Sequence, residues 1–282
     1  MAEGDKLEHQ CLQKEFEWVL NEEVHSILHQ LNIILNECVR RFPSWDSDVQ
    51  VKQEKFVLST SPDQLKSIVS ISGDTILQAD IQFKVQRHQQ QIMYRTNIRH
   101  DCPWKLHQVQ DAGNHLRQAI LQIEKIDKET IFNSSEEVLH ILRNLLGCLQ
   151  RGRTSLIVPR KRTIDDLIKS RNMKCLTPNL PEDLAISFYI QSHKLIFAVY
   201  QLSNSHGAMK YDTYQAECTV PWLNEVLVLF TVALQLAQQL KDKVIIQFVN
   251  MPICCNNLYF TFMLDLRVYP VQRYYSVVAT SF

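Results

Sequence analysis

Glycine is scarce in this chain, with six residues among 282. Loops that hold phosphate groups need glycine, because only glycine lets backbone N–H groups come close to the ligand. Neither GxGxxG nor GxxxxGK[ST] occurs. Nucleotide binding through these common loops is therefore excluded.

The chain also lacks a net charge, since thirty basic and thirty acidic side chains cancel. No overall field draws it to nucleic acid or to an anionic membrane, so such a partner would need a local patch. PRKR at 159–162 resembles a minimal nuclear-import signal. A solvated loop is the simpler interpretation, and nuclear import or contact with acidic lipid stays open. Positive charge is concentrated there, at Arg151, Arg153, Arg160, Lys161 and Arg162.

The eight cysteines contain no CxxC pair, and the N-terminus MAEGDKLEHQ lacks the apolar stretch that export requires. These features predict a reducing cytoplasmic or nuclear setting. The adjacent Cys254 and Cys255 are interpreted as idle or buried thiols, with a redox or palmitoylation site as the alternative.

Apolar residues at helical spacing predict four long helices. The first covers residues 12–39 and ends before Phe42-Pro43, because proline disfavours helical geometry in the preceding residue. Others are predicted after Pro103-Trp104 and over residues 135–150, with Ser134 or Ser135 as N-cap. The last runs from Pro221 to Lys243, and it is apolar around so much of its circumference that it should lie inside a bundle.

Short runs rich in β-branched and aromatic residues predict strands in two places. Residues 55–59, 66–72, 79–85 and 91–98 indicate a four-stranded antiparallel meander, with a turn at Gly73-Asp74. A hairpin over residues 183–202 and a strand over 213–220 follow later.

Helices and strands separated along the chain in this way predict an α+β protein, in which an antiparallel helical bundle carries an inserted antiparallel β domain. The N-terminal and last helices should then be neighbours. The predicted division is as follows: residues 10–42, 103–150 and 221–246 form the bundle, 52–102 and 180–220 the β domain, 151–179 a basic connector with a short helix, and 247–282 a poorly packed tail.

Leucine-rich seams along the predicted helices resemble a zipper, but the helices are short or apolar nearly all round, which favours packing within one chain. A nuclear zipper protein would need a basic region continuous with a heptad helix, and here proline interrupts the basic segment. The predicted zipper-like core comprises Phe16, Leu20, Ile27, Leu31, Leu106, Val109, Leu116, Ile120, Ile123, Leu142, Leu145, Leu149, Leu223, Leu227, Phe230 and Leu234.

No GxSxG elbow or recognisable cysteine-protease context is present, so no catalytic residue is predicted. The alternative is a metal-dependent four-helix-bundle enzyme, because di-iron bundles use paired Glu-x-x-His motifs. Here those motifs are Glu22 with His25 and Glu137 with His140. The two histidines lie off the apolar stripes, which favours surface histidines and predicts no metal or cofactor.

Several segments resemble the Rogdi family, the atypical leucine-zipper proteins, and they lie in the family's order. The residues that carry the resemblance are AECTVPWLNEVLVLFTVALQLAQQLKDK at 216–243, EFEWVLNEEVHSILHQL at 15–31, SGDTILQADIQFKV at 72–85, WKLHQVQDAGNHLRQAI at 104–120 and KLIFAVYQLS at 194–203.

The resemblance implies a monomer with an α domain that holds both terminal helices and a β domain between them. It also implies a non-enzymatic adaptor subunit of the RAVE complex, alongside the rabconnectin-3 proteins, that promotes V-ATPase assembly and vesicle acidification. Such a protein would be cytoplasmic and would reach vesicle membranes, including synaptic vesicles, through its partners, with the nucleus or nuclear envelope as another location. The segment after residue 247 and the short loop between Leu202 and Thr213 depart from the family pattern.

Overall fold

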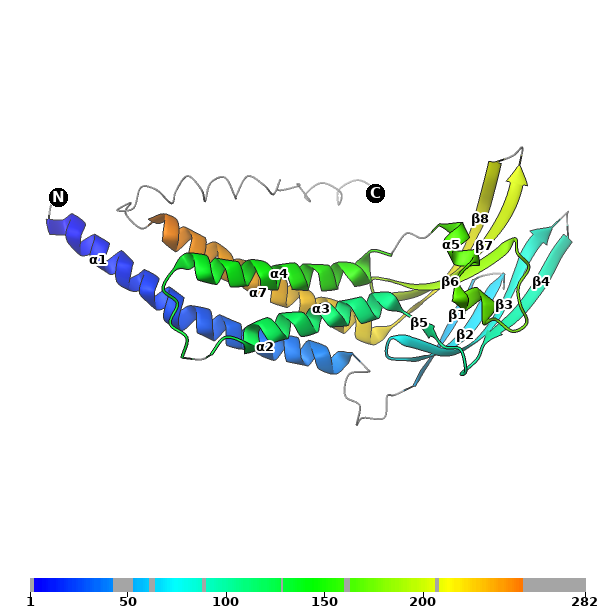
Figure 1. Cartoon of the computed structure of the whole chain (residues 1–282), viewed down its shortest axis with the longest axis horizontal. Helices are drawn as coiled ribbons and strands as arrows, with labels where there is room; N and C mark the ends of the chain where they lie inside the picture. The colour runs from blue at the N-terminus through cyan, green and yellow to red at the C-terminus, as the bar shows by residue number, and fades with distance from the viewer. Residues whose placement is uncertain are drawn as a thin grey trace, which may run out of the picture.

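The computed structural model describes residues 3–42, 53–60, 64–87, 90–127, 129–159, 163–205 and 208–250. Figure 1 shows an elongated molecule with a helical bundle at one end and β-sheets at the other. This arrangement confirms the predicted α+β class, with helices at both ends of the described chain and antiparallel strands between them. The predicted tail lies outside the described residues beyond residue 250.

Four long helical segments form the bundle: α1 (Glu3–Trp18) continuing into α2 (Val24–Arg41), α3 (His107–Glu124), α4 (Ser135–Ile157) and α7 (Pro221–Asn250). A π-helical turn, η1 (Val19–Glu23), joins α1 to α2 without breaking the helix. Such a turn adds a residue to the helical period, which the sequence pattern did not reveal. As predicted, α2 ends before Pro43, and Ser134 caps α4 by accepting from the N–H of Glu137.

The first and last helices are neighbours, as expected from the order of elements. Arg41 of α2 forms an ion pair with Glu225 of α7 at 2.9 Å. Near the far end of the bundle, the Gln247 side chain donates to Glu15 of α1 at 2.9 Å. Residues more than 180 positions apart, such as Cys38 and Val226, therefore lie in one core.

As predicted, α7 lies inside the bundle, where it contacts α2 and α4 and buries one stripe of its surface. Val228 and Val232 are exposed on the opposite side, because α2 and α4 cover a single face. Over Pro221–Val249 the helix is long and apolar enough to cross a membrane by length and composition alone. The buried stripe is Leu223, Val226, Phe230, Ala233, Ala237, Leu240 and Val244.

The first sheet contains β1 (Glu54–Ser59), β2 (Leu65–Ser72), β3 (Thr75–Arg87) and β4 (Gln90–Ile98) as an antiparallel meander in that order. This is the predicted meander, and Gly73 makes its second turn with a positive φ of 62°. A short strand that was not predicted, β5 (Trp104–Lys105), pairs with the start of β3.

The second sheet has the order β6 (Leu184–Gln191), β7 (Lys194–Ser205) and β8 (Ala208–Thr219), and all pairs are antiparallel. Arg87 of the first sheet places a guanidinium nitrogen 2.6 and 2.5 Å from the carboxylate oxygens of Asp183, just before β6. Trp104 of β5 also meets Phe188 of β6 edge to face, with ring centroids 5.9 Å apart. The two sheets are thus joined near the edge of β6.

The predicted connector begins later than expected, because α4 continues to Ile157. Arg151 and Arg153 therefore lie on a bundle helix, where Arg153 donates to Thr231 of α7 at 3.2 Å. Two short helices, α5 (Ile164–Ile168) and α6 (Arg171–Lys174), follow in the connector. Residues 160–162, which carry the proposed import signal, lie outside the described residues.

Candidate interaction site

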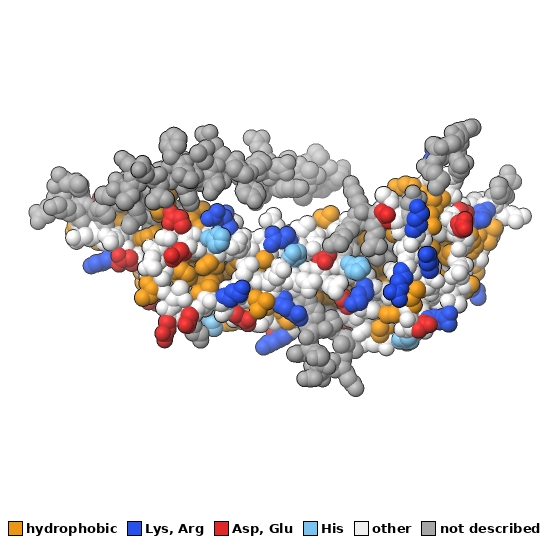
Figure 2. All heavy atoms as spheres, in the orientation of Figure 1, with side chains coloured by type: hydrophobic (Ala, Val, Ile, Leu, Met, Phe, Trp, Pro, Cys, Tyr) orange, Lys and Arg blue, Asp and Glu red, His pale blue; other side chains and the backbone are white. Residues whose placement is uncertain are grey.

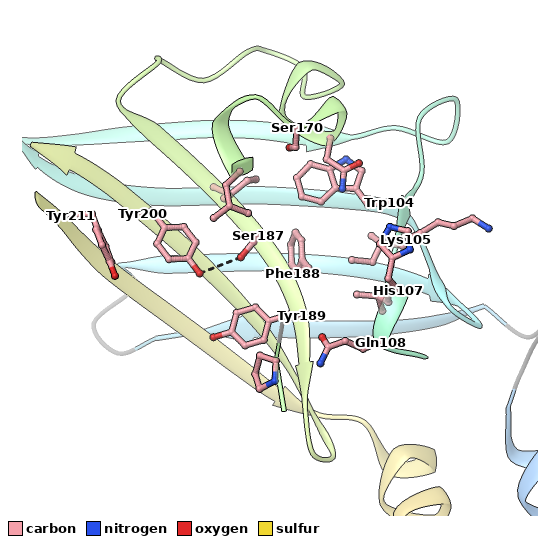
Figure 3. Close-up of a pocket in the computed structure, with 16 residues that line it drawn as sticks. Trp104, Lys105, His107, Gln108, Ser170, Ser187, Phe188, Tyr189, Tyr200 and Tyr211 are labelled. Carbon is pink, nitrogen blue, oxygen red and sulfur yellow. Dashed lines mark hydrogen bonds between the residues drawn. The ribbon is translucent and has the colours of Figure 1, made fainter. Parts of the chain in front are cut away.

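The site with the most features of a binding surface is a cleft of about 520 Å³ between the two sheets, next to the connector. Figure 3 shows it around β6, with Trp104 and Lys105 on one side and Tyr200 and Tyr211 on the other. The sequence predicted β6 but not β5, so it gave no sign that these two strands border one cleft.

Strand β6 is an edge strand, because β7 pairs with only one of its sides. On the other side, the Gln108 side chain replaces a neighbouring strand at Ile190. Its amide oxygen accepts from the N–H of Ile190 at 2.8 Å, and its amide nitrogen donates to the carbonyl of Ile190 at 2.7 Å. Further along, the N–H of Ile186 faces the sulfur of Met173 at 3.5 Å.

Phe188 lies midway between these two capped positions. Backbone groups alternate along a strand, so its N–H and C=O point away from β7, as those of Ile186 and Ile190 do. Within the described residues, no group forms a hydrogen bond with either of them. Phe188 therefore presents one free donor and one free acceptor on the edge of β6 in the cleft.

Aromatic rings line both sides of this edge. Phe188 stacks on Phe197 with centroids 4.9 Å apart and meets the ring of Trp104. Trp104 is only 3% exposed, and its indole N–H has no hydrogen-bond partner among the described residues. A buried indole N–H usually has an acceptor, so this group marks a place where an acceptor from another molecule would fit.

On the outer face of β6, two tyrosine hydroxyl groups are held in place. Ser187 donates to the hydroxyl oxygen of Tyr200 at 3.4 Å, and Gln215 donates to that of Tyr189 at 3.1 Å. Burial, and secondarily the nearby Tyr200, raises the pKa of Tyr189, so its phenol stays protonated. Tyr211 is 57% exposed and meets Tyr200 edge to face, which extends the aromatic surface toward solvent.

The charge of the cleft is positive. Lys105 and His107 line it, and the described residues that line it include no aspartate or glutamate. The start of α3 at His107 adds the positive end of an 18-residue helix dipole. The cleft therefore favours a ligand with negative charge on this side.

A disulfide between Cys102 and Cys175 ties the segment before β5 to the end of α6. No disulfide was predicted, because these two cysteines meet only after the chain folds. The bond joins residues 73 positions apart and holds the connector beside the cleft. Their spacing in the sequence carried no signal for this pairing. Among the described residues, the other cysteines are free: Cys11, Cys38, Cys148 and Cys218.

The free thiols differ in their environment. Burial, with a smaller contribution from Glu37, raises the pKa of Cys38 from 9.0 to about 12, and burial beside Glu217 raises the pKa of Cys218 to about 11. Only the thiolate reacts with alkylating agents. A buried thiol that stays protonated is therefore chemically inert at neutral pH.

We expect iodoacetamide at pH 8 to label the exposed Cys11 in the folded protein and to leave Cys38 unmodified, with mass spectrometry of the peptides as the measurement. At a pKa of about 12 roughly one thiol in ten thousand is ionised at this pH. Because folding keeps Cys38 protonated, its contribution to stability is complete below pH 9 and declines as pH rises toward 12. Rapid labelling of Cys38 without unfolding would contradict the buried position.

The predicted zipper-like residues all lie within the helical core of one chain. Twelve are buried, and Phe16, Ile27, Leu227 and Leu234 are partly buried against them. The buried seam along α7 is shifted by one residue from the predicted one. Val226 and Ala233 are fully buried, whereas the predicted Leu227 and Leu234 are only partly buried. The buried members are Leu20, Leu31, Leu106, Val109, Leu116, Ile120, Ile123, Leu142, Leu145, Leu149, Leu223 and Phe230.

The paired Glu-x-x-His motifs do not form a ligand set. His25 places Nε2 2.7 Å from the carbonyl oxygen of Thr130 and stacks on Phe132. Glu137 accepts from the N–H of Asn133 at the start of α4, and His140 contacts Asn144 one turn along the same helix. Across the described part of the chain, no three His, Cys, Asp or Glu side chains gather at a place that could hold a metal ion.

Comparison with known proteins now assigns the chain to a family. Residues 15–214 match the family model described as Rogdi leucine zipper containing protein. Protein rogdi of Drosophila melanogaster is 56% identical over 246 residues, which are 86% of this chain and 91% of the relative. The chain belongs to the Rogdi family. The Rogdi homologues of Danio rerio and Homo sapiens are 38% and 37% identical, over 86% and 84% of this chain and 96% and 92% of their own lengths.

The Rogdi match begins in α1 and ends in β8, so it includes both sheets and every strand that borders the cleft. It also includes α2, α3 and α4, whose leucines pack inside one chain rather than along a two-chain zipper. In this Rogdi protein the zipper-like pattern thus corresponds to the core of a bundle. The cleft lies outside this core, between the two sheets.

Proposed function

We propose that this chain is a non-enzymatic adaptor subunit of the RAVE complex that promotes V-ATPase assembly together with rabconnectin-3 proteins. Membership of the Rogdi family carries the proposal. The cleft supports it, because a free strand edge, aromatic rings and positive charge are features of protein recognition. In this proposal the protein works in the cytoplasm and reaches vesicle membranes through its partners.

The shape of the molecule also suits an adaptor. The bundle and the sheets lie at opposite ends of a long particle (Figure 1), and Figure 2 shows apolar and charged groups interspersed along one face of it. Two separate ends allow two partners to bind without competing for one surface. A subunit that brings two parts of a larger machine together needs this separation.

The experiment is affinity purification of the tagged full chain from cells in mild detergent, followed by mass spectrometry. We expect rabconnectin-3 proteins and V-ATPase subunits to be enriched about ten-fold or more over the same tag on an unrelated cytoplasmic protein, as for partners that remain bound during washing. Loss of the chain should also raise vesicle pH, and re-expression should restore it. Recovery of the chain alone, with vesicle pH unchanged by its loss, would contradict the proposal.

A further inference from the structure

The edge of β6 is arranged to receive one more strand. The Gln108 side chain already forms hydrogen bonds with the N–H and C=O of Ile190, as a neighbouring strand would. Met173 faces the N–H of Ile186. Between them Phe188 offers a free N–H and a free C=O directed into the cleft. A short extended peptide laid along β6 would use both groups, as in recognition by strand addition.

The walls of the cleft fit the alternating side chains of such a peptide. In a strand, successive side chains point to opposite faces. One set would meet the rings of Trp104 and Phe188 between the sheets, and the other set would meet Ser187 and Tyr189 on the outer face of β6. The volume of about 520 Å³ lies within the range of pockets that bind ligands of this size.

Two further groups define the chemistry of the peptide. The buried indole N–H of Trp104 has no acceptor among the described residues, and a carbonyl of an added peptide would supply one. Lys105 makes the β5 end of the cleft positive, and none of the described residues that line it is acidic. We propose that an extended segment of a partner protein, with alternating apolar side chains and an acidic residue near Lys105, adds as a strand to the edge of β6.

This inference rests on the proposed function, because it assigns the surface through which the adaptor holds a partner. It differs from a groove for a helix, since the recognising groups are the backbone of Phe188 and the flanking rings. The end of the connector is held beside the first sheet by backbone hydrogen bonds of 2.9 and 3.1 Å between Asn97 and Thr177, so the surface is formed before the peptide arrives. A preformed surface reduces the ordering that binding requires.

The first test selects peptides from a displayed library of random octapeptides on the purified full chain. We expect the selected peptides to share alternating apolar residues and one acidic residue. One selected peptide is then made with a single N-methyl group at each position in turn, because N-methylation removes one backbone donor. Methylation at the one residue whose N–H pairs with the carbonyl of Phe188 should weaken binding about five-fold or more, and methylation at its immediate neighbours should change it less than about two-fold.

Substitutions in the protein locate the peptide. Lys105→Glu reverses a charge on an exposed side chain and should weaken binding of the acidic peptide about ten-fold at low salt, whereas the matched control Lys55→Glu on β1 should not. Trp104→Phe keeps the ring packing but removes the indole N–H, and should weaken binding about five-fold. Circular dichroism and thermal unfolding establish that each variant is folded.

Other outcomes overturn the inference. Selected peptides that bind Lys105→Glu and Trp104→Phe as tightly as the original chain place the docking surface elsewhere, and equal sensitivity to N-methylation at all positions excludes strand addition. Failure to select any peptide also counts against it. If such failures accompany recovery of V-ATPase subunits from cells, the adaptor function stands and only the docking surface is wrong. If the peptide binds as expected but no such subunits are recovered, the proposed function fails alone.

Discussion

Replacing Gln108 with methionine is expected to lower the free energy of unfolding by about 2–4 kcal/mol, although methionine has nearly the same size and shape. Gln108 is 7% exposed, and its amide makes three hydrogen bonds to backbone groups. It accepts from the N–H of Ile190, and it donates to the carbonyls of Ile190 and Ser155. Methionine would leave a buried N–H and two carbonyls without these partners, and urea denaturation measures the cost.

The matched control is Gln239→Met on the exposed face of α7, which should change the free energy of unfolding by less than about 0.5 kcal/mol. Gln108→Glu adds a second test, because a carboxylate can still accept from Ile190 but cannot donate to the two carbonyls. It should destabilise the protein as well. A stability unchanged in Gln108→Met would show that water satisfies these backbone groups and that Gln108 does not join the bundle to β6.

Gln108 illustrates what sequence patterns miss. It lies between Leu106 and Val109, both of which the helical period assigned to the core, and as a polar residue it received no role. Its partners Ser155 and Ile190 are 47 and 82 positions away. Periodicity reports which face of a helix is buried, but it does not report that a buried amide will pair with the edge of a distant strand.

The regular elements were predictable for local reasons. Alternation in β2 and β3 and the turn at Gly73 define the first meander, but a bulge between Ser70 and Ile71 shifts the register by one residue, so that Leu65 faces Phe83. The three- and four-residue spacing of Leu116, Ile120 and Ile123 defines α3 in the same way. Helix α2 also ends before Pro43, because proline disfavours helical geometry in the residue that precedes it. In each case the signal lies within a few residues of the element itself.

The candidate site depended on contacts between distant segments and could not be predicted. The pairing of Trp104 with Ile76 creates β5, and a strand of two residues has no period of its own. The bond from Cys102 to Cys175 is equally non-local. The cleft itself arises because β6 has a partner on only one side, which is a property of the sheet order rather than of the residues in β6.

Close contact between α4 and α7 leads to the second large prediction, in which Gly152→Ala is destabilising by about 1–2 kcal/mol. A Cβ atom at Gly152 would lie 2.9 Å from Cε1 and Cζ of Phe230 and 3.3 Å from Cβ of His115. Phe230 is fully buried, so its ring must shift and disturb the core. This cost exceeds the gain of about 1 kcal/mol that alanine brings to a helix, and chemical denaturation measures the difference.

Gly147 in the same helix is the matched control, because the nearest atom to an added Cβ there is the end of the flexible Arg151 side chain at 3.2 Å. Gly147→Ala should therefore stabilise the protein by about 0.5–1 kcal/mol. Phe230→Leu should relieve the crowding at Gly152, so the double variant should be more stable than the sum of the two single changes by about 1 kcal/mol. Strict additivity would show that the ring of Phe230 is not what excludes a side chain at position 152, and that α4 and α7 do not approach each other as closely as the structure places them.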